Sequence, residues 1–286
     1  MRRFFITAIA LFVLCMDQAR AGNHEGLPEE TTKRFDLVLV HGLSNKHRWS
    51  EDFLRECLEI WGSGRVFIVY TGTSSEVLEK EIDSRKIVYA GGDGSDAGRV
   101  SIEKQATIMA SRIDELEKRY GLRTPFSIIA HSMGGLVARR YIAEHPGEVA
   151  DLVTLGTPHH GSPLAESFQW MGFFLSATEA IEDLKPENME RFNTAYPVAK
   201  APLAEGGRIY TIRGVPEGSD CFGWSGELLF GWQVLAKAYD TGNDGLVPED
   251  SALIEGAIHI GDFPGFDHYH LVQRAEVVKK AAEYLR

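Results

Sequence analysis

A serine flanked by small residues is the part of this sequence best suited to nucleophilic chemistry. Ser132 follows the apolar segment 126–131 and precedes a helix-like segment, 136–144, with Ala130 two residues before it and Gly134 two residues after it. This is the sequence form of a nucleophile elbow, in which the serine occupies a sharp strand-to-helix turn and only small neighbours avoid a clash. The turn also places the serine at a helix N-terminus, where free amides stabilise negative charge. The pattern therefore predicts Ser132 as a nucleophile.

A serine nucleophile needs a base and an acid that orients the base. In enzymes built on this elbow, the acid and then the histidine follow the serine along the chain. Asp244 lies in the turn-rich loop 242–248, and His268 and His270 lie between the last strand-like and the last helix-like segment. We expect Asp244 to be the acid and His268 the base, with His270 as the alternative base. The competing interpretation of Asp244 is an ordinary turn aspartate.

The reaction of such a serine also needs donors for the oxyanion that develops on the substrate. The backbone N–H of Met133 follows the nucleophile directly, and the loop His41-Gly42-Leu43 follows the first strand-like segment. We predict the amides of Leu43 and Met133 as the two donors. Each donor of this kind is typically worth about 2.7–4 kcal/mol of transition-state stabilisation.

The elements that must position these residues alternate between strand-like and helix-like segments. That alternation is typical of an α/β fold, with a mostly parallel sheet covered by helices on both faces. The predicted strands are 35–40, 65–71, 126–131, 149–155, 208–214 and 257–260, and the predicted helices are 50–61, 101–120, 136–144 and 271–285. No linker, repeat or low-complexity run divides the chain, so we predict one domain over residues 22–286.

The alternation stops between about residues 163 and 202. Apolar residues gather at 168–175, ahead of a charged helical piece at 187–192. We predict a lid insertion whose apolar side faces an acyl-chain site. The alternative is an ordinary helical insertion with a buried face.

The first 21 residues have the form of a signal peptide. Arg2 and Arg3 precede the apolar stretch 4–16, and Ala19-Arg20-Ala21 supplies a cleavage site. The apolar stretch is shorter than the roughly 20 residues of a membrane span. We therefore expect a protein exported to the periplasm or secreted.

Charge and cysteine content narrow the classes of partner. Cleavage after residue 21 changes 30 basic and 41 acidic residues to 27 and 40, a net charge of −13, which argues against nucleic-acid binding. Cys57 and Cys221 remain, and they form either one disulfide or two unpaired buried thiols. No C-x-x-C or H-E-x-x-H spacing predicts a metal site.

Several segments together resemble the bacterial true lipases, the Pseudomonas/Burkholderia-type and Bacillus-type triacylglycerol lipases of the α/β-hydrolase superfamily. The matching segments follow the family's order through most of the mature chain. They are 38–43 (VLVHGL), 130–139 (AHSMGGLVAR), 154–162 (TLGTPHHGS), 191–197 (RFNTAYP), 243–247 (NDGLV) and 267–268 (DH).

The resemblance implies the α/β-hydrolase fold with a helical lid and a triad of Ser132, Asp244 and His268. It also implies Leu43 and Met133 as oxyanion donors, and no cofactor. The implied substrate is an acyl ester or lipid, met at a lipid–water interface.

The sequence departs from this family at one position. Many relatives bind a structural calcium through an aspartate two residues after the catalytic histidine, and here that position is His270. Some relatives need a membrane-anchored folding helper, on which the sequence gives no information.

The function that these features predict is that of a secreted serine carboxylic-ester hydrolase, a lipase or lipase-like esterase. The same motifs occur in phospholipase-like hydrolases, and the same serine serves acyltransferases that pass the acyl group to an acceptor other than water. An inactive scaffold that binds lipid or a partner through the apolar segment is the alternative of another class. The intact set of Ser132, Asp244 and His268 argues against that scaffold.

Overall fold

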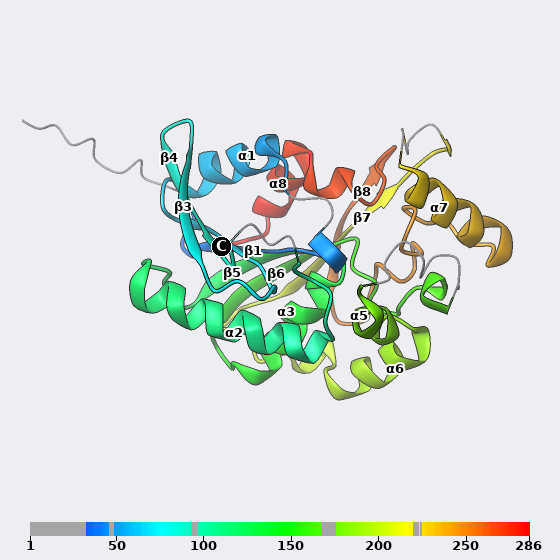
Figure 1. Cartoon of the computed structure of the whole chain (residues 1–286), viewed down its shortest axis with the longest axis horizontal. Coiled ribbons are helices and arrows are strands. Elements are labelled where there is room, and N and C mark those ends of the chain that lie inside the picture. The colour runs from blue at the N-terminus through cyan, green and yellow to red at the C-terminus, as the bar shows by residue number, and fades with distance from the viewer. Residues whose placement is uncertain (1–32, 46–48, 93–95, 167–175, 220–222, 224) are drawn as a thin grey trace, which may run out of the picture. The chain divides into compact units, whose positions relative to one another are not determined.

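A mostly parallel sheet forms the centre of the fold, as the alternating pattern predicts (Figure 1). Its eight strands lie in the order β3-β4-β2-β1-β5-β6-β7-β8, and every neighbouring pair is parallel except β3 with β4. The strands are β1 (Leu37–Val40), β2 (Val66–Val69), β3 (Val77–Ile82), β4 (Arg85–Ala90), β5 (Phe126–His131), β6 (Val149–Leu155), β7 (Ile209–Val215) and β8 (Ile258–Pro264). The computed structural model describes residues 33–45, 49–92, 96–166, 176–219, 223 and 225–286.

Helices cover both faces of this sheet (Figure 1). They are α1 (Glu51–Trp61), α2 (Ile102–Arg119), α3 (Gly134–Glu144), α5 (Thr178–Asp183), α6 (Pro186–Ala195), α7 (Gly226–Ala238) and α8 (Ala275–Ala282). Helices α1 and α8 contact each other on one face, and α2 and α3 contact each other on the other face. Among the described residues, no helix combines the length and the apolar character needed to cross a membrane.

The sheet separates two apolar cores because successive side chains of a strand point to opposite faces. In β1, Val38 and Val40 join the core under α2 and α3, and Leu37 and Leu39 join the core under α1 and α8. All four side chains are fully buried. A near-continuous apolar run is therefore the expected sequence of such a central parallel strand.

The structure corrects the predicted elements at three places. The antiparallel hairpin of β3 and β4 was not predicted, and its turn at Asp83 and Ser84 uses positive φ angles of 49° and 63° without a glycine. Helix α7 was also missed. The closing helix begins at Ala275 instead of residue 271, because a short 3-10 turn, His270–Val272, precedes it.

Two predicted segments lie wholly or partly outside the described residues. The proposed signal peptide, 1–21, is outside them, and so is the apolar centre of the proposed lid, residues 167–175. The described remainder of the lid region contains a 3-10 turn, Pro163–Glu166, followed by α5 and α6. The charged helical piece predicted at 187–192 is confirmed within α6.

The parallel strands bring the predicted site residues to one edge of the sheet. In a parallel sheet, the loops that follow the carboxyl ends of the strands meet at the same edge, which is where ligands of such folds bind. His41 follows β1, Ser132 follows β5, Gly156 follows β6 and Asp267 follows β8 within three residues. The fold therefore gathers loops from four strands around the serine.

Candidate active site

Ser132 occupies a strained turn between β5 and α3, as the elbow motif predicts. Its φ angle is +54°, a left-handed conformation that costs a residue other than glycine about 1–2 kcal/mol. Its amide donates to the carbonyl of Leu155 at 2.8 Å. A Cβ atom on Gly42 would lie 2.7 Å from the Cβ of Ser132, so the loop after β1 can approach the serine only without a side chain there.

The helix after Ser132 is also held close to the first strand. A Cβ atom on Gly134 would lie 2.3 Å from the carbonyl oxygen of His41. The glycine two residues after Ser132 is therefore required by the packing of the elbow against the loop after β1.

Asp244 and His268 form a buried pair beside this turn. Asp244 Oδ2 lies 2.7 Å from His268 Nδ1, and each side chain is only 2% exposed. The other carboxylate oxygen, Oδ1, accepts the amides of Leu246 at 3.1 Å and Val247 at 2.8 Å. The loop thus holds one oxygen of the carboxylate and leaves the second for the imidazole.

The pairing fixes the tautomer of the imidazole. A carboxylate only accepts, so His268 Nδ1 carries the proton and Nε2 is left as a proton acceptor. The structure contains no hydrogen bond between Ser132 and His268 within its described part. In hydrolases without substrate this contact is often long and shortens when substrate binds.

His131 connects the elbow to the loop of His268. Its Nε2 lies 2.9 Å from the carbonyl oxygen of His268, and the two imidazole rings are 4.5 Å apart between centroids. The side chain immediately before Ser132 therefore contacts the backbone of the histidine predicted as its base, which the sequence did not indicate.

Gly156 lies against the Asp244–His268 pair. A Cβ atom at this residue would lie 2.9 Å from Asp244 Oδ2 and 3.2 Å from His268 Nδ1, and its φ angle is +53°. Both the left-handed backbone and the lack of space require glycine.

The two amides predicted as oxyanion donors are available. Met133 is the residue before α3, and Leu43 begins a 3-10 turn, Leu43–Asn45, after β1. Among the described residues, neither backbone N–H donates a hydrogen bond to another group. Within that part of the chain, both amides are therefore free to bind a ligand.

His41 is buried behind this loop and its tautomer is determined by its partners. The amide of Thr71 donates to His41 Nε2 at 3.0 Å, so Nδ1 carries the proton and donates to the carbonyl of Gly42 at 2.8 Å. Burial lowers the pKa of His41 to about 4. The ring is therefore neutral at ordinary pH.

A second buried histidine, His159, lies in the loop after β6. Its Nδ1 is 3.2 Å from Arg139 Nη1, and its Nε2 is 3.2 Å from the hydroxyl of Thr154. Burial, reinforced by the charge of Arg139, lowers the pKa of His159 well below its ordinary value. These contacts hold the loop next to the elbow.

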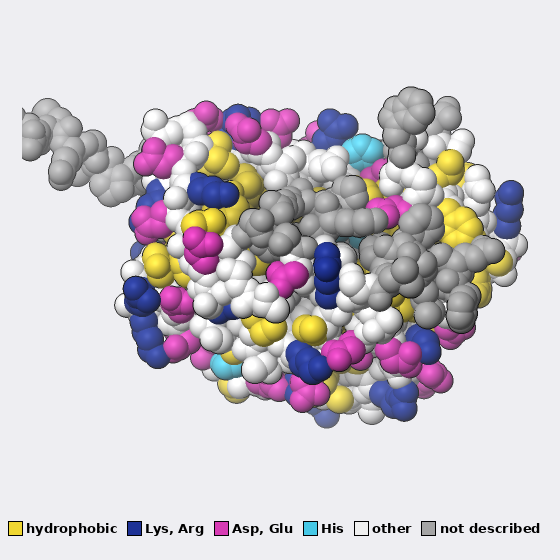
Figure 2. Space-filling model, in the orientation of Figure 1, with side chains coloured by type: hydrophobic (Ala, Val, Ile, Leu, Met, Phe, Trp, Pro, Cys, Tyr) yellow, Lys and Arg dark blue, Asp and Glu magenta, His cyan; other side chains and the backbone are white. Residues whose placement is uncertain are grey.

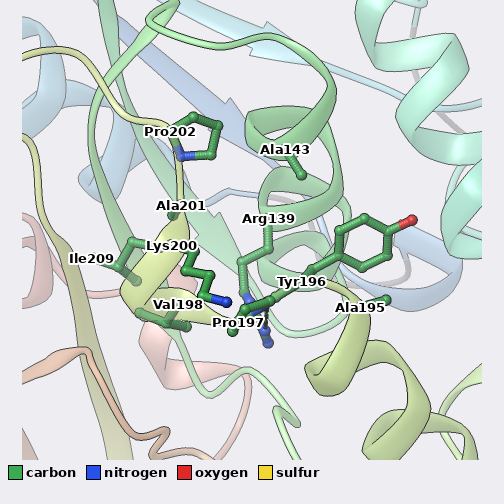
Figure 3. A pocket seen from close by; sticks show the side chains of 10 residues that line it. All are labelled: Arg139, Ala143, Ala195, Tyr196, Pro197, Val198, Lys200, Ala201, Pro202 and Ile209. Atoms are coloured by element: carbon green, nitrogen blue, oxygen red, sulfur yellow. Dashed lines mark hydrogen bonds between the residues drawn. The ribbon is translucent and has the colours of Figure 1, made fainter.

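Arg139 also borders a cavity that is separate from Ser132 (Figure 3). The guanidinium donates to Asn193 Oδ1 at 2.9 Å and to the carbonyl of Tyr196 at 2.7 Å, and burial lowers its pKa to about 10. The cavity has a volume of about 220 Å³ and is lined by Arg139, Ala143, Ala195, Tyr196, Pro197, Val198, Lys200, Ala201, Pro202 and Ile209. Since none of the predicted triad lines it, we assign the contacts of Arg139 to the packing of α6 against α3.

His270, the alternative base, does not reach Asp244. Its Nδ1 lies 3.0 Å from Asp267 Oδ1 and accepts the amide of Asp267 at 3.2 Å. Asp267 Oδ1 in turn accepts the amides of Tyr269 and His270, so these side chains build the turn that carries His268.

The residues at this turn do not fit a calcium ion. The position that carries an aspartate in calcium-binding relatives is His270, whose imidazole nitrogen is not the oxygen ligand that calcium prefers, and Oδ1 of the neighbouring Asp267 accepts two backbone amides. Within the described part of the chain, no group of three or more His, Cys, Asp or Glu side chains could hold a metal ion.

Helix α7 contacts the loops of both Asp244 and His268. The hydroxyl of Tyr269 donates to the buried carboxylate of Glu227, and burial together with this carboxylate raises the pKa of Tyr269. A Cβ atom on Gly231 would lie 2.0 Å from the carbonyl oxygen of Gly245. The sequence does not predict these contacts, and its one signal for them is an acidic residue at the start of an apolar segment.

Apolar side chains of α7 are partly exposed beside this site, and Figure 2 shows hydrophobic atoms on the surface over this helix. The partly buried residues of the helix that pack against the core are Leu229, Phe230, Trp232 and Val234. An apolar surface of this kind beside a reactive group suits an apolar ligand.

Only one of the two cysteines of the mature chain lies among the described residues. Cys57 is a free, fully buried thiol on α1, and burial raises its pKa. Cys221 lies outside the described residues. The choice between a disulfide and two unpaired thiols therefore stays a prediction.

The chain is similar to known hydrolases. A family model described as the alpha/beta hydrolase fold matches residues 37–198, more than half of the chain. The mature lipase of Bacillus licheniformis is 20% identical with a TM-score of 0.65, over 92% of this chain and 96% of that one. A metagenomic carboxyl esterase is 21% identical with a TM-score of 0.64, over 93% and 81% of the two chains. A Staphylococcus hyicus lipase is 14% identical with a TM-score of 0.61, over 91% and 97%. The predicted resemblance to bacterial lipases is thus confirmed in the fold.

The two buried neutral histidines predict how stability depends on pH. Below pH 6.5 the unfolded chain binds protons at His41 and His159 while the folded chain stays neutral, so the free energy of unfolding falls with falling pH. Each histidine contributes up to about 1.4 kcal/mol per pH unit, and the loss from His41 is complete near pH 4. Urea unfolding at pH 7, 6 and 5 measures this slope. A His41→Asn, His159→Gln double variant with an unchanged slope would contradict the assignment.

Because Gly156 packs closely against the Asp244–His268 pair, we expect a methyl group at residue 156 to disturb the contact between these two side chains. Gly156→Ala should lose about 1–2 kcal/mol of stability from the left-handed backbone and should also displace the imidazole. Gly147→Ala is the matched control, because Gly147 has a φ angle of +81° and no atom within 4 Å of its added Cβ. The low-field proton resonance of His268 Nδ1 is expected to shift or vanish only in Gly156→Ala. Its retention there would show that the pair tolerates the methyl group.

Proposed function

Because the chain belongs to the α/β hydrolase fold family, we propose that it is a serine hydrolase of carboxylic esters. The observation that carries this proposal is the buried contact of 2.7 Å between Asp244 Oδ2 and His268 Nδ1 beside the strained serine of the elbow. A carboxylate buried against one imidazole nitrogen leaves the other nitrogen as a base, which is what a serine nucleophile requires.

The proposed reaction uses the residues in the roles that the sequence predicted. His268 Nε2 accepts the proton of Ser132 as the serine oxygen attacks the ester carbonyl, and Asp244 stabilises the imidazolium that forms. The amides of Leu43 and Met133 stabilise the oxyanion. His268 then protonates the leaving alcohol, and water, activated by the same imidazole, hydrolyses the acyl-enzyme.

We propose acyl esters with an apolar acyl chain as the substrate class. The partly exposed apolar residues of α7 lie beside the loops of Asp244 and His268, and they support binding of an acyl chain next to the serine. Two of the similar solved structures are named lipases and one is named a carboxyl esterase, which fits the same class. A lipid–water interface is the proposed place of action.

The proposed role of Ser132 predicts a sharp loss of turnover when this serine is substituted. Ser132→Ala should reduce hydrolysis of p-nitrophenyl esters by at least about 10⁴-fold while the fold is retained, since the nucleophile is removed. Ser127→Ala is the matched control, because Ser127 is a buried serine on β5, the strand that leads to Ser132, and its hydroxyl has no partner in the described part of the chain. It should keep wild-type turnover.

The same assay separates the ester classes when the acyl chain is varied from acetyl to palmitoyl, below and above the solubility limit. A rise with chain length and a jump at the interface would identify a lipase, and activity confined to short dissolved esters would identify an esterase. Near-native turnover of Ser132→Ala, or failure of a serine-reactive phosphonate to label Ser132, would contradict the proposed function.

We also propose export through the N-terminal segment 1–21. The basic start, the apolar stretch and the Ala19-Arg20-Ala21 site support cleavage before Gly22. Expression in a bacterial host is expected to give a periplasmic or secreted protein whose intact mass corresponds to residues 22–286. A full-length product retained in the cytoplasm would contradict export.

A further inference from the structure

The two predicted oxyanion donors belong to peptide groups whose carbonyl oxygens are both held by buried side chains. In a planar trans peptide the C=O and the N–H point in opposite directions. A hydrogen bond to the carbonyl therefore fixes the direction of the amide on the other side without contacting it. The Gly42–Leu43 and Ser132–Met133 peptides carry the predicted donors on their Leu43 and Met133 sides.

His41 holds the first peptide. Its Nδ1 donates to the Gly42 carbonyl at 2.8 Å, and its Nε2 accepts the Thr71 amide at 3.0 Å, so the ring is fixed at both ends. A Cβ atom on Gly98 would lie 2.4 Å from the same carbonyl oxygen, so the chain closes over it from a second side.

Thr157 holds the second peptide. Its hydroxyl donates to the Ser132 carbonyl at 2.8 Å, and the Gly135 amide donates to the same oxygen at 3.0 Å. A Cβ atom on Gly135 would lie 2.2 Å from the Thr157 hydroxyl oxygen, so a glycine there makes room for the threonine.

His41 is also connected through α2 to the side chain of Met133, the residue that carries the second predicted donor. The hydroxyl of Thr71 lies 3.0 Å from His41 Nε2 and donates to Gln105 Oε1 at 2.9 Å. The amide nitrogen of Gln105 donates to the carbonyl of Val100 at 2.7 Å and lies 3.6 Å from Met133 Sδ. One buried polar chain thus runs from the loop after β1 to the elbow.

We propose that His41 and Thr157 are positioning residues that orient the Leu43 and Met133 amides toward the oxyanion. A donor that is fixed before reaction costs no reorganisation when charge develops. The bond to each carbonyl also polarises its peptide and strengthens the N–H as a donor. This role rests on the proposed function, and neither side chain needs to contact the substrate.

The test compares Thr157→Val, which removes the hydroxyl at nearly constant shape, with Thr157→Ser, which retains it. Thr157→Val should lower kcat for p-nitrophenyl esters about 10- to 100-fold with KM little changed, since removing an oxyanion donor outright costs about 10²–10³-fold. Binding of an alkylboronic acid, whose adduct with Ser132 is tetrahedral and anionic, should weaken by the same factor. Thr157→Ser should restore both to within about 3-fold of wild type.

Thr211→Val is the matched control for the loss of a buried hydroxyl. Thr211 lies on β7, where its hydroxyl is 3.0 Å from His259 Nδ1. It should lower thermal stability as Thr157→Val does and leave kcat and boronic acid binding unchanged.

His41→Asn and His41→Leu extend the test to the first peptide. The asparagine amide can replace the Nδ1 donor, so His41→Asn should keep more of kcat than His41→Leu, with KM little changed in both.

The outcomes of this test are separable from those of the proposed function. Wild-type turnover that Ser132→Ala abolishes supports the ester hydrolase whatever Thr157 does. In that case, a Thr157→Val variant with wild-type kcat, or one that changes only KM or thermal stability, would overturn the positioning role. Without turnover that depends on Ser132, the proposed function fails and the positioning role fails with it.

Discussion

The left-handed backbone at Ser132 constrains the packing of every loop around it. A conformation that costs about 1–2 kcal/mol persists only where the surroundings determine it fully. Here the amide of the serine is bonded to β6, its carbonyl is bonded to the loop after β6, and glycines on the neighbouring loops allow the backbones to approach. The sheet supplies the rigid frame for this turn, and the serine is presented at the edge where the other loops meet.

The buried histidines organise this edge of the sheet through hydrogen bonds and add no charge to it. His41 and His159 are kept neutral by burial, and each uses one ring nitrogen to donate and the other to accept. A neutral ring between two partners fixes the orientation of both hydrogen bonds and introduces no charge. The field around the Asp244–His268 pair is therefore not disturbed by a further cation from these two side chains.

Much of the site could be predicted because its signals are local. The small residues around Ser132 follow from the elbow turn itself, and the order of Asp244 and His268 follows from the order of the strands. Local signals do not separate His268 from His270, because two residues in one turn differ only in what they face. The structure gives this difference, since His268 contacts Asp244 and His270 contacts Asp267.

The missed features depend on contacts between distant segments or on weak local signals. The β3–β4 turn at Asp83 and Ser84 lacks the glycine that marks most two-residue hairpins. Helix α7 is apolar on most sides, so it shows no clear stripe at the helical period. The pairing of Glu227 with Tyr269, and of Thr157 with the Ser132 carbonyl, joins residues that are far apart or unremarkable in sequence.

The unpredicted hairpin also determines how the sheet ends. Its outer strand, β3, carries the exposed charges of Glu79, Lys80 and Glu81. The opposite outer strand, β8, carries Asp262, paired with Arg213, and ends at Pro264, which has no amide to donate. Charges and proline on outer strands disfavour the docking of another strand. Both rims of the sheet are thus protected against edge-to-edge aggregation.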